Sequence, residues 1–149
     1  LQKMSKEMGY DYTVEESGDI FKIVINKMRE SVELRESEEN TVVVIDSLHM
    51  GKGDVELGRI LMKGFIYTLS EMEELPKTIL FYNEGVKLAI EGAESLQDLK
   101  SLEERGVEIL SCGTCLNFYG ITEKLRVGSI TNMYTILERQ MKATRVIKP

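Results

Sequence analysis

The chain has 149 residues, 42% of them hydrophobic and 30% charged, which suits one ordinary domain with its own core and excludes an acidic disordered tail. The formal net charge of −6 argues against nucleic acids and anionic membrane surfaces as partners, because both are bound through clustered Lys and Arg. No apolar run is long enough to span a bilayer and no signal peptide opens the chain, so we expect a cytoplasmic protein.

Residues 1–28 differ in pattern from the rest of the chain. Residues 1–8 suit the last turns of a helix, and the runs 10–15 and 20–25 flank a Ser-Gly-Asp turn, which is typical of a β-hairpin. A helix end and one hairpin bury little surface, so we expect this unit to need missing sequence or a neighbour. The chain also begins with Leu1 rather than Met, and we expect a fragment or a processed chain.

Residues 29–40 are mostly charged and predict a linker or a solvated helix, with a domain boundary near Asn40. From residue 41 onward, β-branched runs typical of covered strands alternate with helical patterns. This alternation predicts an α/β domain over residues 41–149, a three-layer α/β/α arrangement around a mainly parallel sheet. Strands are expected at 41–46, 78–82, 107–111 and 144–148, helices at 55–72, 86–90, between Ser95 and Gly106 and around 133–141, and a short strand or loop at 125–130.

The expected helix over 55–72 carries two apolar sets, and Asp54 is placed to cap its start. A helix that is apolar most of the way round is buried on more than one side, so we expect a homo-oligomer that uses this helix. The set expected to face the core is Leu57, Ile60, Leu61, Phe65, Leu69 and Met72, and the set expected at the subunit interface is Val55, Met62 and Ile66.

Polar groups and thiols follow the carboxyl ends of the expected strands, where open parallel sheets bind their ligands. Asn83, His49 and Asn132 are therefore candidate substrate-binding residues beside a pair of cysteines. The alternative is that these residues only cap helices and end strands. His49 is a loop residue on this interpretation, and Asn83 is an N-cap.

The cysteine turn Cys112-Gly113-Thr114-Cys115 follows an expected strand and precedes an expected helix. Free amides at a helix start favour thiolate, which is the form that takes sulfur from a persulfide or attacks a disulfide. We therefore expect Cys112 to be the more exposed and more acidic thiol, and Cys115 to resolve what Cys112 binds. The alternatives are two small buried hydrophobes, or a zinc site shared between subunits; one subunit offers only these cysteines and His49, so no metal is expected within it.

The loop with Gly51 and Gly53 also lies at this edge, and its glycines suit an anion-binding nest beside Lys52. It matches neither the Walker pattern nor G-x-G-x-x-G, and a tight loop before a helix capped by Asp54 explains it equally well. We expect no cofactor.

Four runs in this order, residues 42–69, 81–92, 106–121 and 127–138, closely resemble the C-terminal domain of the YedF family of sulfurtransferase-like proteins of selenium metabolism. The resemblance implies a DsrE-like fold for residues 41–149. It also implies a persulfide on Cys112, since proteins of the wider DsrE group carry sulfur on a cysteine that is followed by Gly-Ile, here Gly120-Ile121. Residues 1–28 resemble the end of a TusA-like domain, whose sulfur-accepting Cys-Pro segment would lie upstream.

The sequence therefore predicts a sulfur or selenium carrier, or a sulfurtransferase-like protein, with Cys112 as acceptor and Cys115 as resolving thiol. The expected partner is a sulfur-donor or sulfur-acceptor protein. The alternative is a thiol-disulfide redox sensor or an oligomeric assembly protein without turnover. Neither the chalcogen nor enzymatic turnover follows from the residues.

Overall fold

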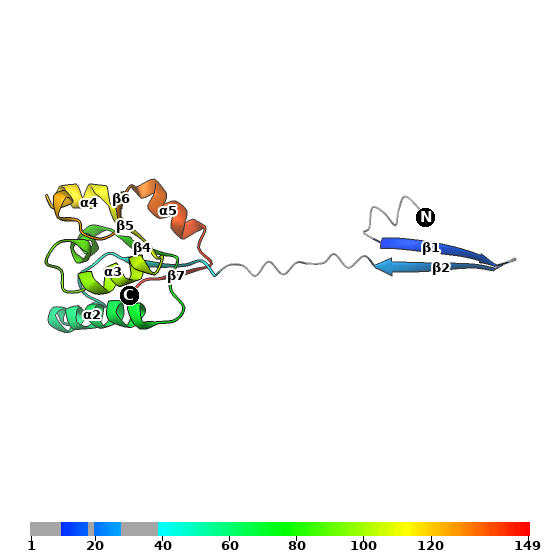
Figure 1. Cartoon of the computed structure of the whole chain (residues 1–149), viewed down its shortest axis with the longest axis horizontal. Coiled ribbons are helices and arrows are strands. Elements are labelled where there is room, and N and C mark those ends of the chain that lie inside the picture. Colours follow the sequence, from blue (N-terminus) through cyan, green and yellow to red (C-terminus); the bar gives the residue numbers. More distant parts are fainter. Residues whose placement is uncertain (1–9, 18–19, 28–38) are drawn as a thin grey trace. The chain divides into compact units, whose positions relative to one another are not determined.

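A computed structural model of the chain describes residues 10–17, 20–27 and 39–149 (Figure 1). The chain divides into two compact units, residues 1–38 and 39–149, and each is described by itself. The helix end expected at residues 1–8, and the linker as far as residue 38, lie outside the described residues.

The first unit contains a β-hairpin, as predicted. Strands β1 (Tyr10–Ser17) and β2 (Ile20–Lys27) pair antiparallel, with Tyr10 opposite Lys27 and Ser17 opposite Ile20.

The second unit is built on a five-stranded sheet in the order β6-β5-β4-β3-β7, and all its neighbouring strands run parallel. This confirms the predicted parallel α/β fold, and the segment expected as strand or loop at 125–130 ends in a short edge strand. The strands are β3 (Thr41–Ile45), β4 (Thr78–Phe81), β5 (Glu108–Cys112), β6 (Ser129–Thr131) and β7 (Arg145–Ile147).

Helices cover both faces of this sheet, so the predicted three layers are present. In Figure 1, α2 (Val55–Glu71) and α3 (Leu96–Glu104) lie below the strands, and α4 (Gly113–Phe118) and α5 (Met133–Met141) lie above them. Helix α5 leads the chain from β6 at one edge of the sheet back to β7 at the other. Two 3-10 helices, η1 (Asn83–Ala89) and η2 (Thr122–Lys124), complete the unit.

The core lies where the three central strands meet these helices. Residues 42–45 of β3 and 78–81 of β4 are all buried, because both strands are covered by helices on both faces.

None of the helices in the described part of the chain is both long and apolar enough to cross a membrane.

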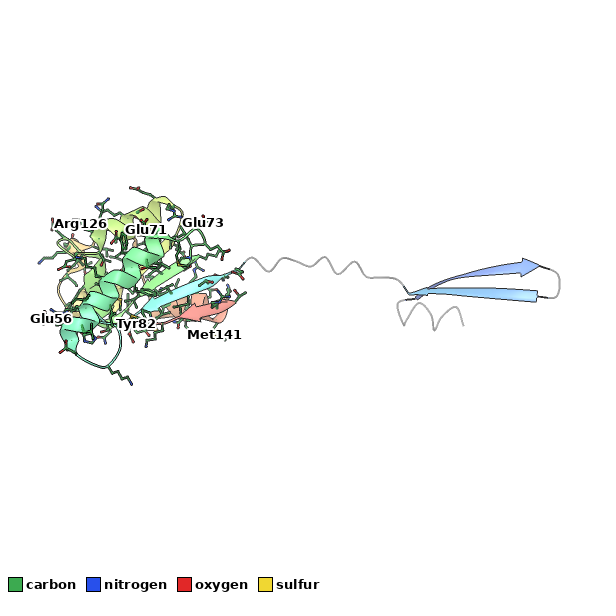
Figure 2. All side chains as sticks on the ribbon, turned by 90° about the horizontal axis from the view of Figure 1, so that it is seen from below. Glu56, Glu71, Glu73, Tyr82, Arg126 and Met141 are labelled. Carbon is green, nitrogen blue, oxygen red and sulfur yellow. The ribbon has the colours of Figure 1, made fainter. Side chains whose placement is uncertain are left out.

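Helix α2 buries a different row of side chains from the predicted one. Four residues expected in the core are exposed instead: Leu57, Ile60, Leu61 and Met72, at 54%, 63%, 46% and 48%. Met62 and Ile66, which were assigned to a subunit interface, are buried against the sheet of their own chain. The prediction that Met62 and Ile66 lie at a subunit interface is therefore wrong. Figure 2 shows α2 from its outer side, with Glu56 and Glu71 labelled near its two ends.

Gly58 explains the orientation of α2. It lies one helical turn before Met62, and a Cβ atom built on it would come within 2.8 Å of the Cβ atom of His49 and 3.1 Å of the main-chain oxygen of Met50. The glycine therefore lets the loop after β3 pack directly on the helix. The row that contains Gly58 faces inward, and the more hydrophobic row faces outward.

The helix caps follow the sequence only in part. Asp54 caps α2 as predicted, because its Oδ1 atom accepts a hydrogen bond of 2.9 Å from the Leu57 main-chain N–H. Ser95 precedes α3 but makes no such side-chain bond.

In α5 only Ile136 is buried, whereas Met133 and Leu137 are more than half exposed.

Candidate functional site

Cys112 is the last residue of β5 and stands directly before α4, as the sequence predicts. Its side chain is only 2% exposed, whereas Cys115 is half-buried. The expectation that Cys112 is the more exposed thiol is therefore wrong. The reason is that Cys112 is still part of the sheet, where it pairs with Thr131 of β6, and its side chain belongs to the buried core cluster.

Gly113 begins α4 immediately beside β6. A Cβ atom on this residue would lie 2.9 Å from Ile130 Cγ2 and 3.3 Å from the Thr131 main-chain oxygen. The glycine thus suits the close approach of the edge strand.

Cys115 is held by the neighbouring strand-to-helix connection. Its Sγ atom accepts a hydrogen bond of 3.1 Å from the main-chain N–H of Asn83, the first residue of η1. Among the described residues other than glycine, Asn83 alone has a positive φ, of 50°. Left-handed backbone is disfavoured for residues with a side chain, and asparagine tolerates it better than most. The hydrogen bond joins the carboxyl end of β4 to α4.

Tyr119 completes this arrangement from the end of α4. Its hydroxyl donates a hydrogen bond of 3.1 Å to Asn83 Oδ1. The Lys87 ammonium lies 4.1 Å from the centroid of the Tyr119 ring and 3.4 Å from Glu84 Oε1. Neither Tyr119 nor Lys87 was predicted from the sequence. The spacing of Tyr119 four residues after Cys115, on one face of a helix, is the feature that could have identified it.

The two cysteines interact while both are free thiols. Burial raises the pKa of the Cys115 thiol, and the neighbouring Cys112 side chain raises it further. The Asn83 main-chain N–H acts in the opposite direction, since a donor to sulfur favours thiolate and lowers the pKa of Cys115. The net effect is a pKa above the usual value, because burial is the largest cause.

The other predicted site residues lie at the same edge of the sheet, with contacts of their own. His49 Nδ1 lies 2.9 Å from Ser47 Oγ within the loop after β3. Gly51, with φ of 78°, and Gly53 are exposed in the same loop. Asn132 caps α5, accepting a hydrogen bond of 3.0 Å from the Thr135 main-chain N–H. Of these predicted residues, Asn83 is the one that the structure joins to a cysteine by a hydrogen bond.

A surface groove of about 550 Å³ lies between α2 and the segment after η1. Its apolar wall includes Leu48, Ile60 and Leu88, and Lys87 links the groove to Tyr119 of the thiol site. Within the described residues, no three His, Cys, Asp or Glu side chains gather as they would to hold a metal ion.

Residues 60–149 match the DsrE/DsrF-like family, which is more than half of the chain. No curated protein matches the sequence. Three solved structures share the fold at 21%, 15% and 10% identity, with TM-scores of 0.53, 0.52 and 0.51. They are the protein MTH1491 of unknown function from Methanobacterium thermoautotrophicum, the YchN protein of E. coli, and the conserved protein BT1422 of unknown function from Bacteroides thetaiotaomicron. The matches cover 73%, 74% and 74% of this chain and 97%, 99% and 95% of those chains, respectively.

Proposed function

Because the chain belongs to the DsrE/DsrF-like family, which is generally related to sulfur relay, we propose that it carries sulfur as a persulfide on Cys112 with Cys115 as the resolving thiol. The observation that carries this proposal is the position of both sulfur atoms in one turn at the carboxyl edge of the sheet, close enough for one to alter the pKa of the other. A dithiol in this position suits transfer of a sulfur atom between proteins.

Release from Cys112 has two balanced routes. In the first, a thiolate of an acceptor protein attacks the terminal sulfur of the Cys112 persulfide, and Cys112 leaves as thiolate. In the second, the Cys115 thiolate attacks Sγ of the Cys112 persulfide, a Cys112–Cys115 disulfide forms, and hydrosulfide leaves. The second route needs a thiol reductant before the next cycle.

The finer proposal is a protein of the YedF type, and it rests on the four ordered sequence runs between residues 42 and 138. On this proposal residues 1–28 are the end of a TusA-like domain, and the cargo is sulfur or selenium. The partner is a protein that donates or accepts this atom. Self-association is part of the same proposal, since an exposed apolar row runs along α2.

A thiol-disulfide switch without turnover is the second candidate, and the free state of both cysteines favours it as well. The two functions differ in the product that a sulfur donor leaves on the protein. A carrier gains the mass of one sulfur atom on a cysteine, whereas a switch gains no sulfur and loses two thiols on oxidation. Intact-protein mass spectrometry after incubation with a persulfide donor separates them.

A further inference from the structure

The two thiols of the pair differ in their access to solvent. Cys112 is 2% exposed and belongs to the core cluster, and Cys115 is half-buried. The residues around Cys115 on α4 are open, since Thr114 and Asn117 are exposed and Phe118 is 83% exposed. A donor protein that approaches this edge therefore meets Cys115 before it can reach Cys112.

Cys115 is also the thiol that the structure holds in place. The Asn83 main-chain N–H donates a hydrogen bond of 3.1 Å to its sulfur, and Asn83 itself has a left-handed backbone with φ of 50°. Such a conformation is unfavourable by about 1 kcal/mol or more for a residue with a side chain, so its presence needs a compensating contact. The Tyr119 hydroxyl supplies one by donating to Asn83 Oδ1.

Two charged side chains and the second thiol lie near this contact. The Cys112 side chain interacts with Cys115, and the Lys87 ammonium lies 4.1 Å from the centroid of the Tyr119 ring and 3.4 Å from Glu84 Oε1. A donor amide stabilises negative charge on sulfur, both in the attacking thiolate and in a departing one.

We propose that sulfur enters the pair through Cys115, and that Asn83 and Tyr119 are positioning residues that hold the Cys115 sulfur for this exchange. The proposal rests on the proposed sulfur-carrier function and names the order in which the two thiols act.

The exchange is balanced at each step. The Cys115 thiolate attacks the terminal sulfur of a donor protein's persulfide; the new bond joins that sulfur to Cys115 Sγ, the donor S–S bond breaks, and the donor cysteine leaves as thiolate. Cys112 then attacks the same sulfur, and its thiol proton passes to the neighbouring Cys115 sulfur. A bond to Cys112 Sγ forms, the bond to Cys115 breaks, and Cys115 leaves as a thiol. No oxidant is required.

Single cysteine variants of the full chain test the order, with a desulfurase and cysteine as the persulfide source. Cys115→Ser, and Cys115→Ala as a second variant, should load Cys112 at least about tenfold more slowly than the wild type, since the buried thiol must then be reached directly. Cys112→Ser should load Cys115 at close to the wild-type initial rate. Unchanged loading of Cys112 in both Cys115 variants would overturn the entry order and leave the carrier function standing. No adduct on any variant, or on the wild type, would overturn both.

The positioning role has a separate readout, the pH dependence of Cys115 alkylation in a Cys112→Ser background. Asn83→Ala should slow alkylation at neutral pH about tenfold, because alanine disfavours the left-handed backbone and its main-chain N–H is then no longer held against the Cys115 sulfur. Asn83→Gly retains that backbone and should react close to the parent. Tyr119→Phe should slow the reaction less than Asn83→Ala, and Tyr134→Phe, at a tyrosine that is 78% exposed on α5, should not change it. Equal rates in Asn83→Ala and Asn83→Gly would overturn the positioning role.

Discussion

Gly85 of η1 lies directly against the main-chain carbonyl group of Ile45, the last residue of β3. A Cβ atom on Gly85 would overlap the Ile45 oxygen and come within 2.8 Å of its carbonyl carbon. The Gly85 N–H also donates a hydrogen bond of 3.1 Å to the Tyr82 oxygen, which closes the turn that contains Asn83. The contact between η1 and the end of β3 therefore helps to fix the amide that holds Cys115.

Replacement of Gly85 should destabilise the domain. Gly85→Ala would push the buried main chain of η1 away from the Ile45 carbonyl group. We expect it to lower the free energy of unfolding by about 1–3 kcal/mol. Gly64→Ala in α2 is the matched control, since a Cβ atom there would meet no atom within 4 Å; it should raise stability by about 0.5–1 kcal/mol. Urea unfolding measures both. Equal stability of the two variants would contradict the close contact.

The ion pair between Glu108 and Arg139 should make the free energy of unfolding depend on pH in the acidic range. The hydrogen bonds from Arg139, at 2.8 and 2.9 Å, hold the pKa of Glu108 below its usual value of 4.5. A lowered folded-state pKa gives stability that is present above the usual value and is lost as the pH falls through the folded-state value.

Glu108→Gln should therefore be less stable than the wild type at pH 7, by at most about 1 kcal/mol because the pair is partly exposed. This difference should shrink below pH 4.5, where the unfolded wild type begins to take up the proton. Glu73→Gln, at an exposed residue after α2, serves as the control. Urea titrations from pH 7 to about pH 3 check this, and a difference that is constant over the range would refute it.

The outer row of α2 should support self-association. Val55, Leu57, Ile60 and Leu61 are 52%, 54%, 63% and 46% exposed, and a second copy of the chain would bury them. Ile60→Glu should lower the association constant at least about tenfold without unfolding the domain, as expected for a charge placed at the centre of an apolar interface. Met133→Glu, on the exposed face of α5, is the matched control. Sedimentation equilibrium measures both, and a wild type that is monomeric at micromolar concentration would contradict the prediction.

Cys115 should react faster as the pH rises through the alkaline range. Burial is the largest cause that raises the pKa of the Cys115 thiol, and it remains when Cys112 is replaced, so the thiolate fraction of Cys115 should grow about tenfold per pH unit below that raised pKa. Alkylation of Cys112→Ser, followed from pH 7 to about pH 10, should show this slope without an early plateau. A plateau below pH 9 would show that the amide of Asn83 outweighs burial.

The same pair should form a reversible disulfide under mild oxidation, because both thiols are free and interact within one turn. The number of free thiols found by titration should then fall by two per chain and recover after treatment with a reductant. Each single cysteine variant should lose the effect. Oxidation that yields only disulfides between chains would contradict an exchange within the pair.

The sequence sufficed for the parts of the fold that depend on local pattern. Alternating apolar runs predicted the parallel sheet, and the Ser-Gly-Asp turn and Asp54 predicted the hairpin and a helix cap. The rotation of α2 was not predictable from spacing, because both of its apolar rows have helical periodicity. The decisive feature is Gly58, whose lack of a side chain admits the loop after β3.

The location of the site at the sheet edge was predictable from the sequence, but the burial and contacts of its residues were not. The place of Cys112 at the end of a strand follows from the sequence, but its burial depends on core residues that come from distant parts of the chain. The hydrogen bond from Asn83 to Cys115 likewise joins residues 32 positions apart, and the left-handed backbone of Asn83 has no signal in the neighbouring sequence. Such non-local contacts leave no periodic pattern.

The most direct measurement of the central claim is fragmentation mass spectrometry of the wild-type chain after incubation with a desulfurase and cysteine. The peptide that contains both thiols should carry the mass of one additional sulfur atom, located on Cys112 at equilibrium and removed by a reductant. Cys112→Ser should hold no sulfur at that position, and the double Cys112→Ser, Cys115→Ser variant should gain none. A wild-type peptide that stays unmodified, while a known persulfide carrier in the same reaction is loaded, would contradict the proposal that this protein carries sulfur.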